Sequence, residues 1–259
     1  MKYSLEVLNE IFNYHLKEQK SISQIAKERN INRRSLTRAL SNNGFKINNY
    51  KSNGHFVYEY YFSSIDTNNK AYILGLLYAD GCLTKCKNRP TVSLTLHIQD
   101  KYLLDKISKC IGKNIPVYIE KNNKATIKIQ RPQWEKDLLK WGVFNNKSNN
   151  GDLSFPNIDE QYVGAFIRGF LDGDGSVNKL GHFRLCGTSK QLLEDIKNIL
   201  QSLGCSKKVN LHKAKTKKGV PYYYLHFATK DTTKIIYPFI YKNAELFLER
   251  KKKRIENYI

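Results

Sequence analysis

The chain has 259 residues, 41% of them hydrophobic and 12% aromatic, which is enough for a buried core and excludes a disordered chain. Its 44 lysines and arginines outnumber its 23 aspartates and glutamates, for a formal charge of +21. Because the basic residues are spread among Tyr, Asn, Gln and Thr, this charge predicts nucleic acid as partner ahead of an anionic membrane. No segment approaches the ~20 apolar residues of a membrane span, and the N-terminus lacks an apolar signal-peptide core. We therefore expect a cytoplasmic protein. The abundance of Lys, Asn, Ile and Tyr suggests an AT-rich genome and, with the N-terminal domain described next, favours a bacterial or phage-infected cell over an organelle.

Residues 1–46 predict a helix-turn-helix domain. Apolar side chains recur at helical spacing over 5–16, and Ser21 or Ser23 is placed to cap a second, short helix. Asn30 then supplies a turn, and a third helix is expected from Arg33 to Leu40. This helix carries side chain types that reach phosphates and base edges in a major groove: Arg33, Arg34, Ser35, Thr37 and Arg38. A three-helix packing module with a solvated basic face is the alternative interpretation.

Residues 47–58 are polar and rich in Asn, Ser and Gly, so we expect them to form a linker. Beyond it, two segments share one pattern, an apolar helix that ends at Asp-Gly: AYILGLLYADG at 71–81 and FIRGFLDGDGSV at 166–177. A similar succession of predicted strands and helices follows both segments. The sequence therefore predicts an internal duplication, with repeats at 59–150 and 151–259.

Aligning Asp80 with Asp174 gives an offset of 94 residues (174 − 80) that also superimposes small residues of the two helices. Small residues four positions apart lie on one helical face and allow close packing, so the predicted helix interface consists of Gly75, Ala79, Gly169 and Gly173. Such packing brings the two aspartates together at the helix C-termini, where like charges and helix dipoles favour a cation. Mg²⁺ takes hard oxygen ligands and accepts phosphate, so the pair predicts metal-dependent phosphodiester chemistry. Asp172 lies nearby, but its counterpart is Tyr78, so we expect Asp172 to be a hydrogen-bonding or capping residue.

Each repeat is expected to order its elements as helix, strands, helix, strands, helix. In the first, 91–98 alternates apolar and polar residues, and a hairpin turns at Asn122-Asn123. The second repeat places strands at 182–187 and in a hairpin over 209–228. The polar strand faces collect side chains suited to base edges and phosphates: Lys128, Gln130, Arg184, His212, Lys215, Tyr222, Tyr224 and His226. For any single one of them, an ordinary solvated face is an equal alternative.

The stretches ILGLLYADG at 73–81 and IRGFLDGDG at 167–175 resemble the two signature motifs of LAGLIDADG homing endonucleases. The resemblance covers about 60–259. It implies an α+β fold, a pseudo-two-fold duplicated αββαββα core with saddle-shaped DNA-binding sheets, beside the small all-α N-terminal domain. It also implies a monomeric hydrolase for intron homing that cuts both strands of a long, asymmetric DNA target with magnesium.

Carried over by position, the resemblance makes Asp80 and Asp174 the metal ligands. Gln99 and Thr188 would stand in the outer catalytic shell, and Lys147 and Lys251 would be the basic partners: the six together form the predicted catalytic set. The alternatives are an RNA-binding intron maturase and a non-catalytic DNA-binding transcription regulator on the same scaffold. A recombinase would need a catalytic serine or tyrosine system, and no constellation in the sequence supports one.

Overall fold

The computed structural model describes residues 3–18, 20–47, 56–86, 89–144, 153–205, 209–217 and 219–259. By its internal contacts the chain divides into two compact units. One consists of Met1–Tyr61 with Ser108–Pro116, and the other of Phe62–Ile107 with Val117–Ile259. No helix in the described part of the chain has the length and apolar character needed to cross a membrane.

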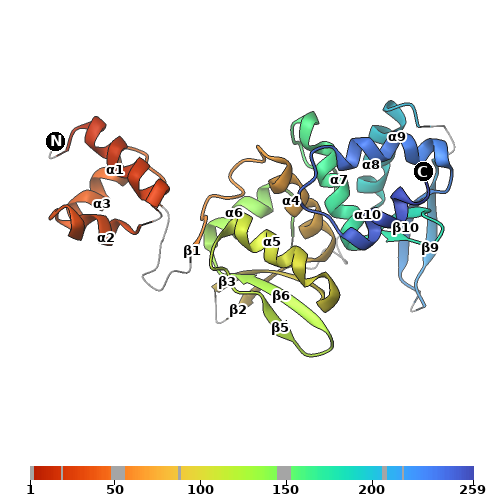
Figure 1. Ribbon diagram of the computed structural model, residues 1–259, viewed down its shortest axis with the longest axis horizontal. Helices are drawn as coiled ribbons and strands as arrows, with labels where there is room; N and C mark the ends of the chain where they lie inside the picture. Colours follow the sequence, from red (N-terminus) through yellow and green to blue (C-terminus); the bar gives the residue numbers. More distant parts are fainter. Residues whose placement is uncertain are drawn as a thin grey trace. The chain divides into compact units, whose positions relative to one another are not determined.

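The helices of the first unit are α1 (Leu5–Glu18), α2 (Ile22–Glu28) and α3 (Arg33–Asn42) (Figure 1). Ser21 starts α2 with a capping box, because its side chain and that of Gln24 each accept a hydrogen bond from the other's backbone N–H. Asn30 makes the turn before α3 at a positive φ of 51°. Buried apolar residues of all three helices form one core cluster: Leu8, Ile11, Ile22, Ile25, Ala26, Leu36 and Leu40. The expected helices are therefore present, whereas their role as a DNA-binding helix-turn-helix stays a prediction.

The predicted linker extends too far towards the C-terminus. Phe56–Val57 forms strand β1, which pairs antiparallel with β4 (Gly112–Lys113), and the Tyr58 N–H donates to the Ile111 carbonyl at 2.9 Å. Phe56 and Val57 are buried, and removing these two apolar side chains from water stabilises the strand relative to an exposed linker. Residues 48–55 lie outside the described part.

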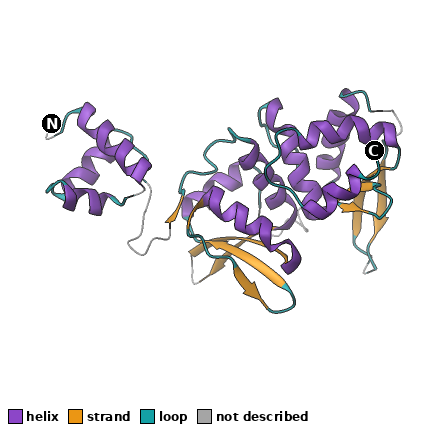
Figure 2. Ribbon diagram, viewed as in Figure 1, coloured by secondary structure: helices purple, strands orange, loops and turns teal. Residues whose placement is uncertain are grey.

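The predicted order of elements occurs twice. The first repeat contains α4 (Asn68–Asp80), β2 (Gly81–Cys86), β3 (Arg89–His97), α5 (Lys101–Ile111), β5 (Tyr118–Glu120), β6 (Lys124–Ile129) and α6 (Pro132–Lys140). The second contains α7 (Glu160–Asp174), β7 (Ser176–Val177), β8 (Phe183–Gly187), α8 (Lys190–Ser202), β9 (Leu211–Lys215), β10 (Pro221–Phe227) and α9 (Lys230–Tyr241), and α10 (Glu249–Glu256) follows. The strands of the two repeats form separate sheets (Figure 2). Both sheets are antiparallel and have equivalent strand orders, β2-β3-β6-β5 and β7-β8-β10-β9. The α+β fold class is thus confirmed.

Helices α4 and α7 are buried along most of their length and lie side by side in the second unit (Figure 1). Thr67 caps α4 and Asp159 caps α7, through side-chain oxygens that accept from backbone N–H groups of the first turn. Each helix ends at an aspartate followed by a glycine with extended backbone. A Cβ on Gly81 or Gly175 would overlap the carbonyl oxygen four residues earlier, so both repeats need glycine there.

Candidate active site

The contact between α4 and α7 is made by glycines that let the two backbones touch. A Cβ built on Gly75 would overlap the Phe166 carbonyl, and one built on Gly169 would overlap the Tyr72 carbonyl. The two contacts are related by the sequence offset, since 169 − 75 and 166 − 72 both equal 94. The helices therefore pack about a pseudo-two-fold axis that relates the repeats.

The carboxylates of the two motifs leave this helix pair at the same end. A Cβ on Gly173 would overlap the Ala79 methyl group and lie 3.2 Å from Oδ2 of Asp80. Asp174 is the next residue along α7, and both aspartates are exposed. The geometry thus brings the end of one motif against the end of the other.

The donor set fits a hard divalent cation whose remaining ligands come from water and phosphate. Asp80 and Asp174 stand at the C-terminal ends of their helices, where the helix dipoles add negative potential. Within the described residues no cluster of three or more His, Cys, Asp and Glu side chains is arranged to hold a metal ion by itself. Mg²⁺ commonly binds through one or two carboxylates plus substrate phosphates, so the two aspartates are sufficient protein ligands.

Lys251 lies beneath the end of α7 instead of projecting into solvent. It is 4% exposed, and its Nζ donates to the carbonyl oxygens of Leu171, Asp172 and Gly175, each at 2.7 Å. The three acceptors match the three protons of the ammonium group, so each of these carbonyl oxygens near the end of α7 gains a hydrogen-bond donor. Burial lowers the pKa of Lys251 to about 8, against the raising effect of the Asp172 and Asp80 carboxylates. The structure therefore gives Lys251 a supporting contact; its predicted catalytic role stays a prediction.

Asp172 is a buried hydrogen-bonding residue, as expected from its unmatched position. Its Oδ2 accepts from the Tyr72 hydroxyl at 2.7 Å and from the Leu248 N–H at 2.8 Å. Burial raises the pKa of this carboxyl, and the nearby Lys251 charge opposes the rise. In the first repeat the counterpart Tyr78 donates its hydroxyl to the Trp141 carbonyl instead. The two repeats therefore differ immediately behind the candidate ligands.

The C-terminal helix α10 connects the two repeats, a feature that the sequence pattern did not reveal. Arg250 forms a bidentate pair with Asp100, with N···O distances of 2.9–3.2 Å, and these hydrogen bonds raise the pKa of Arg250. Tyr102 accepts from the Glu249 N–H at 2.7 Å, and Arg254 donates to the Val177 carbonyl at 2.8 Å. One short helix thus holds the turn after β3 and the strand after α7.

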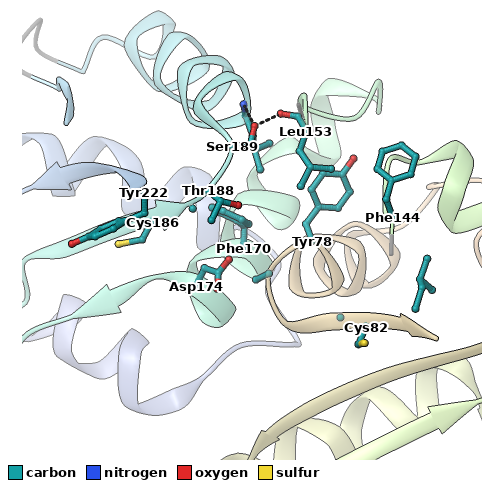
Figure 3. A pocket seen from close by; sticks show the side chains of 15 residues that line it. Tyr78, Cys82, Phe144, Leu153, Phe170, Asp174, Cys186, Thr188, Ser189 and Tyr222 are labelled. Atoms are coloured by element: carbon teal, nitrogen blue, oxygen red, sulfur yellow. Dashed lines mark hydrogen bonds between the residues drawn. The ribbon is translucent and has the colours of Figure 1, made fainter. Parts of the chain in front are cut away.

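A cavity of about 470 Å³ opens beside Asp174 (Figure 3). Cys186 and Tyr222 line it from the second sheet and Thr188 from the loop after β8, while Tyr78 and Cys82 line it from the first repeat (Figure 3). Sequence reasoning included Thr188 and Tyr222 but missed the cysteines, which carry no repeat signal. Gln99 is not among the lining residues; it is exposed in the 3₁₀ turn Ile98–Asp100 after β3. Lys147 lies outside the described residues.

The second sheet presents an ordered polar face. The rings of His212 and Tyr224 stack with centroids 4.9 Å apart, and the Arg184 guanidinium lies 5.2 Å from the Tyr224 centroid. Strand register places these three with Tyr222 and His226 on one face. The prediction that Lys215 shares this face is wrong. Lys215 pairs with Pro221, three residues from His212, and successive side chains alternate between faces, so it points to the other side.

The polar face of the first sheet carries shorter side chains around Lys128 and Gln130. Lys128 forms an ion pair with Glu120 at 2.6 Å, which lowers the pKa of Glu120. Gln130 donates weakly to the Thr91 hydroxyl at 3.4 Å, and Thr95 bonds Thr126 at 2.9 Å. In the first unit, α3 carries the remaining predicted contacts: Arg33, Arg34, Ser35, Thr37 and Arg38.

Residues 161–240 match the family model described as LAGLIDADG-like domain. The structure of I-DmoI in complex with DNA and Ca aligns with a TM-score of 0.51 and 16% identity, over 73% of this chain and 97% of that one. The I-LtrWI LAGLIDADG homing endonuclease bound to target DNA aligns with a TM-score of 0.46 and 15% identity, over 74% of this chain and 88% of that one.

Among curated proteins, the DNA-directed RNA polymerase subunit Rpo1C of Methanocaldococcus jannaschii is 25% identical over 200 residues, which cover 73% of this chain and 20% of that protein. The chain therefore spans about one fifth of the length of this relative. At 16% identity the I-DmoI alignment bears on the fold alone. The family match and this likeness of fold together identify a LAGLIDADG-like domain in the chain.

Proposed function

We propose that this protein is a site-specific double-strand DNA endonuclease, a homing endonuclease that hydrolyses phosphodiester bonds with divalent metal, Mg²⁺ by preference. The observation that carries the proposal is the meeting of the two helix ends, where Oδ2 of Asp80 lies 3.2 Å from the Cβ position of Gly173, next to Asp174. Supporting it, the I-DmoI structure with this fold was determined with DNA and Ca.

Asp80 and Asp174 would hold the cation between the repeats. A divalent cation bound there supplies an activated water and stabilises negative charge on the phosphate oxygens. The protein keeps the two carboxylates in place through the glycine contacts of α4 and α7 and through the Lys251 contacts at the end of α7. Both supports act on the helix backbones, so they position the two carboxylates and leave the carboxylate oxygens available to the cation.

Double-stranded DNA is the proposed substrate because the chain has a charge of +21 and two sheets with polar faces. On the second sheet, the Arg184, Tyr224 and His212 stack offers hydrogen-bond donors in a fixed arrangement. On the first, Lys128 and Gln130 stand among short hydroxyl side chains. Because the faces differ, a single chain would read unequal half-sites and would select an asymmetric target.

The test is cleavage of a randomised duplex library with Mg²⁺, including the intron-minus form of the gene's own locus, followed by mapping of the breaks. We expect defined double-strand breaks from the wild type, and binding without cleavage from Asp80→Asn and Asp174→Asn. Asp105→Asn is the matched control, because it changes a surface carboxylate paired with Lys101.

Three results would contradict different parts of the proposal. If both aspartate variants cut as well as the wild type, the assignment of the metal ligands fails. If the wild type cuts no duplex but promotes splicing of an intron RNA, the protein is a maturase. If it only binds DNA, it is a regulator on the same scaffold.

A further inference from the structure

Helix α3 lines a groove beside the core of the first unit, and the side chains that it contributes there include two arginines. Leu36 and Leu40 are fully buried and attach the helix to that core. Arg34 and Arg38 line this groove of about 410 Å³ together with Ser35 and Asn42. Tyr3, which also packs on the core cluster, lines the same groove.

The arginines of this groove differ in their pairing from the other basic residues of the unit. Lys20 is paired with Glu28 at 2.8 Å, and Arg29 with Glu10 at 2.9 Å. Within the described residues, Arg34 and Arg38 have no carboxylate partner, and the ten residues of α3 include no acidic one. Two exposed guanidinium groups on one helix face thus leave their charge available to an anion.

We propose that the groove of α3 is a second DNA-binding site, separate from the candidate active site, in which Arg34 and Arg38 read base edges in a major groove. The two residues are four positions apart, about 6 Å along the helix, which matches about two base-pair steps. Arginine pairs in bidentate fashion with the O6 and N7 atoms of guanine, and Asn42, two turns from Ser35, offers an amide suited to adenine. Arg33 is turned towards α2, where its Nη1 donates to the Ser23 hydroxyl at 3.4 Å. We therefore do not include Arg33 among the residues that read bases.

Duplex DNA is favoured over RNA by the shape of the site. An isolated helix that displays two arginines, a serine and an asparagine on one face fits the wide major groove of B-DNA. The major groove of A-form RNA is too narrow and deep for side chains to read. This proposal rests on the proposed function only because both have DNA as the partner. The site would add a short block of base pairs to the target of the core.

The experiment is selection of randomised duplexes by the full-length protein in EDTA, so that the outcome does not depend on cleavage. The wild type is expected to enrich two separate blocks of sequence. Arg34→Ala/Arg38→Ala should lose one short block, keep the other, and bind the selected duplex about tenfold or more weaker per residue changed. Lys17→Ala/Lys27→Ala removes the same charge from α1 and α2 and should keep both blocks.

Arg34→Lys/Arg38→Lys separates base reading from simple charge attraction. Lysine retains the charge but not the planar fork, so base reading predicts loss of the block with partial retention of affinity. The proposal is overturned if the alanine pair keeps both blocks, if the lysine pair keeps the sequence preference, or if the wild type enriches no outer block. It also fails if the alanine pair weakens binding to a hairpin RNA but not to the duplex. A protein that enriches both blocks yet never cuts with Mg²⁺ would refute the proposed function alone.

Discussion

The hydroxyl of Tyr72 donates a 2.7 Å hydrogen bond to Asp172 across the α4–α7 contact. Both side chains are buried, and the Arg168 guanidinium lies 5.1 Å from the Tyr72 ring centroid. The pseudo-two-fold axis relates this pair to Phe166 and Tyr78, whose rings contact each other edge to face and form no equivalent hydrogen bond. Behind two symmetric aspartates, the protein therefore has one polar support and one aromatic support.

Removing the Tyr72 hydroxyl should destabilise the second unit. Tyr72→Phe deprives a buried carboxylate of one of its two hydrogen-bond donors, which we expect to lower the free energy of unfolding by about 1–3 kcal/mol. Urea unfolding followed by tryptophan fluorescence measures the change. Tyr118→Phe, on an exposed tyrosine, is the control and should leave the midpoint unchanged. Equal midpoints for all three proteins would contradict the role given to this hydrogen bond.

A single methyl group at the helix contact should force α4 and α7 apart. The Cβ of Gly169→Ala would overlap the Tyr72 carbonyl, a backbone group that cannot move aside cheaply. We expect a loss of roughly 1–3 kcal/mol in the free energy of unfolding, measured in urea. In Gly187→Ala the nearest atom is a side-chain carbon of Phe170 at 3.3 Å, so the same added methyl group should cost less. A reversed order of the two variants would show that the helices are not in backbone contact.

The buried support of α7 should respond to loss of Lys251. Lys251→Met leaves three carbonyl oxygens near the end of the helix without their donor, and we expect a loss of about 1–3 kcal/mol in the free energy of unfolding. Lys253→Met removes an exposed lysine of the same helix and is the matched control. If calorimetry gives the two variants the same melting temperature, Lys251 does not stabilise the end of α7.

His15 should make the first unit sensitive to acid. Its side chain is fully buried, with Nδ1 2.7 Å from the Lys20 carbonyl oxygen, and burial lowers the pKa of His15 below its ordinary value of 6.5. The unfolded chain therefore takes up a proton near pH 6.5 that the folded unit resists. The stabilising contribution is present above that pH and is lost as the pH falls through it.

Amide hydrogen exchange of α1, α2 and α3 between pH 8 and pH 5, corrected for intrinsic rates, measures this effect in the full chain. Protection should decrease towards pH 5 in the wild type and much less in His15→Gln, which retains a hydrogen-bonding side chain. Equal dependence on pH in both proteins would place the sensitive group elsewhere.

The elements nearest the candidate site were predictable because they repeat. The Asp-Gly endings and the contact glycines of α4 and α7 recur at one offset, and the order of strands recurs with them, so each copy supports the interpretation of the other. The cap at Ser21, one of two candidate serines, and the turn at Asn30 were predictable for a different reason. They depend on residues within four positions of each other.

Other features depend on contacts that no local pattern encodes. The pair Arg250 and Asp100 joins residues 150 positions apart, and β1 pairs with β4 across more than fifty residues. Lys215 was misplaced because its face follows from strand register, which the residue type does not specify. The position of Lys251 beneath α7 likewise comes from tertiary packing, because a lysine in a basic segment is usually exposed.

The most direct test of the account is strand cleavage by the Asp80 and Asp174 variants on one target duplex with each strand separately labelled. We expect the wild type to cut both strands with Mg²⁺ and neither strand in EDTA. Asp80→Asn and Asp174→Asn should bind the duplex with nearly unchanged affinity and cut neither strand. Normal cleavage of both strands by either variant would contradict the claim that the active site exists only where the ends of α4 and α7 meet.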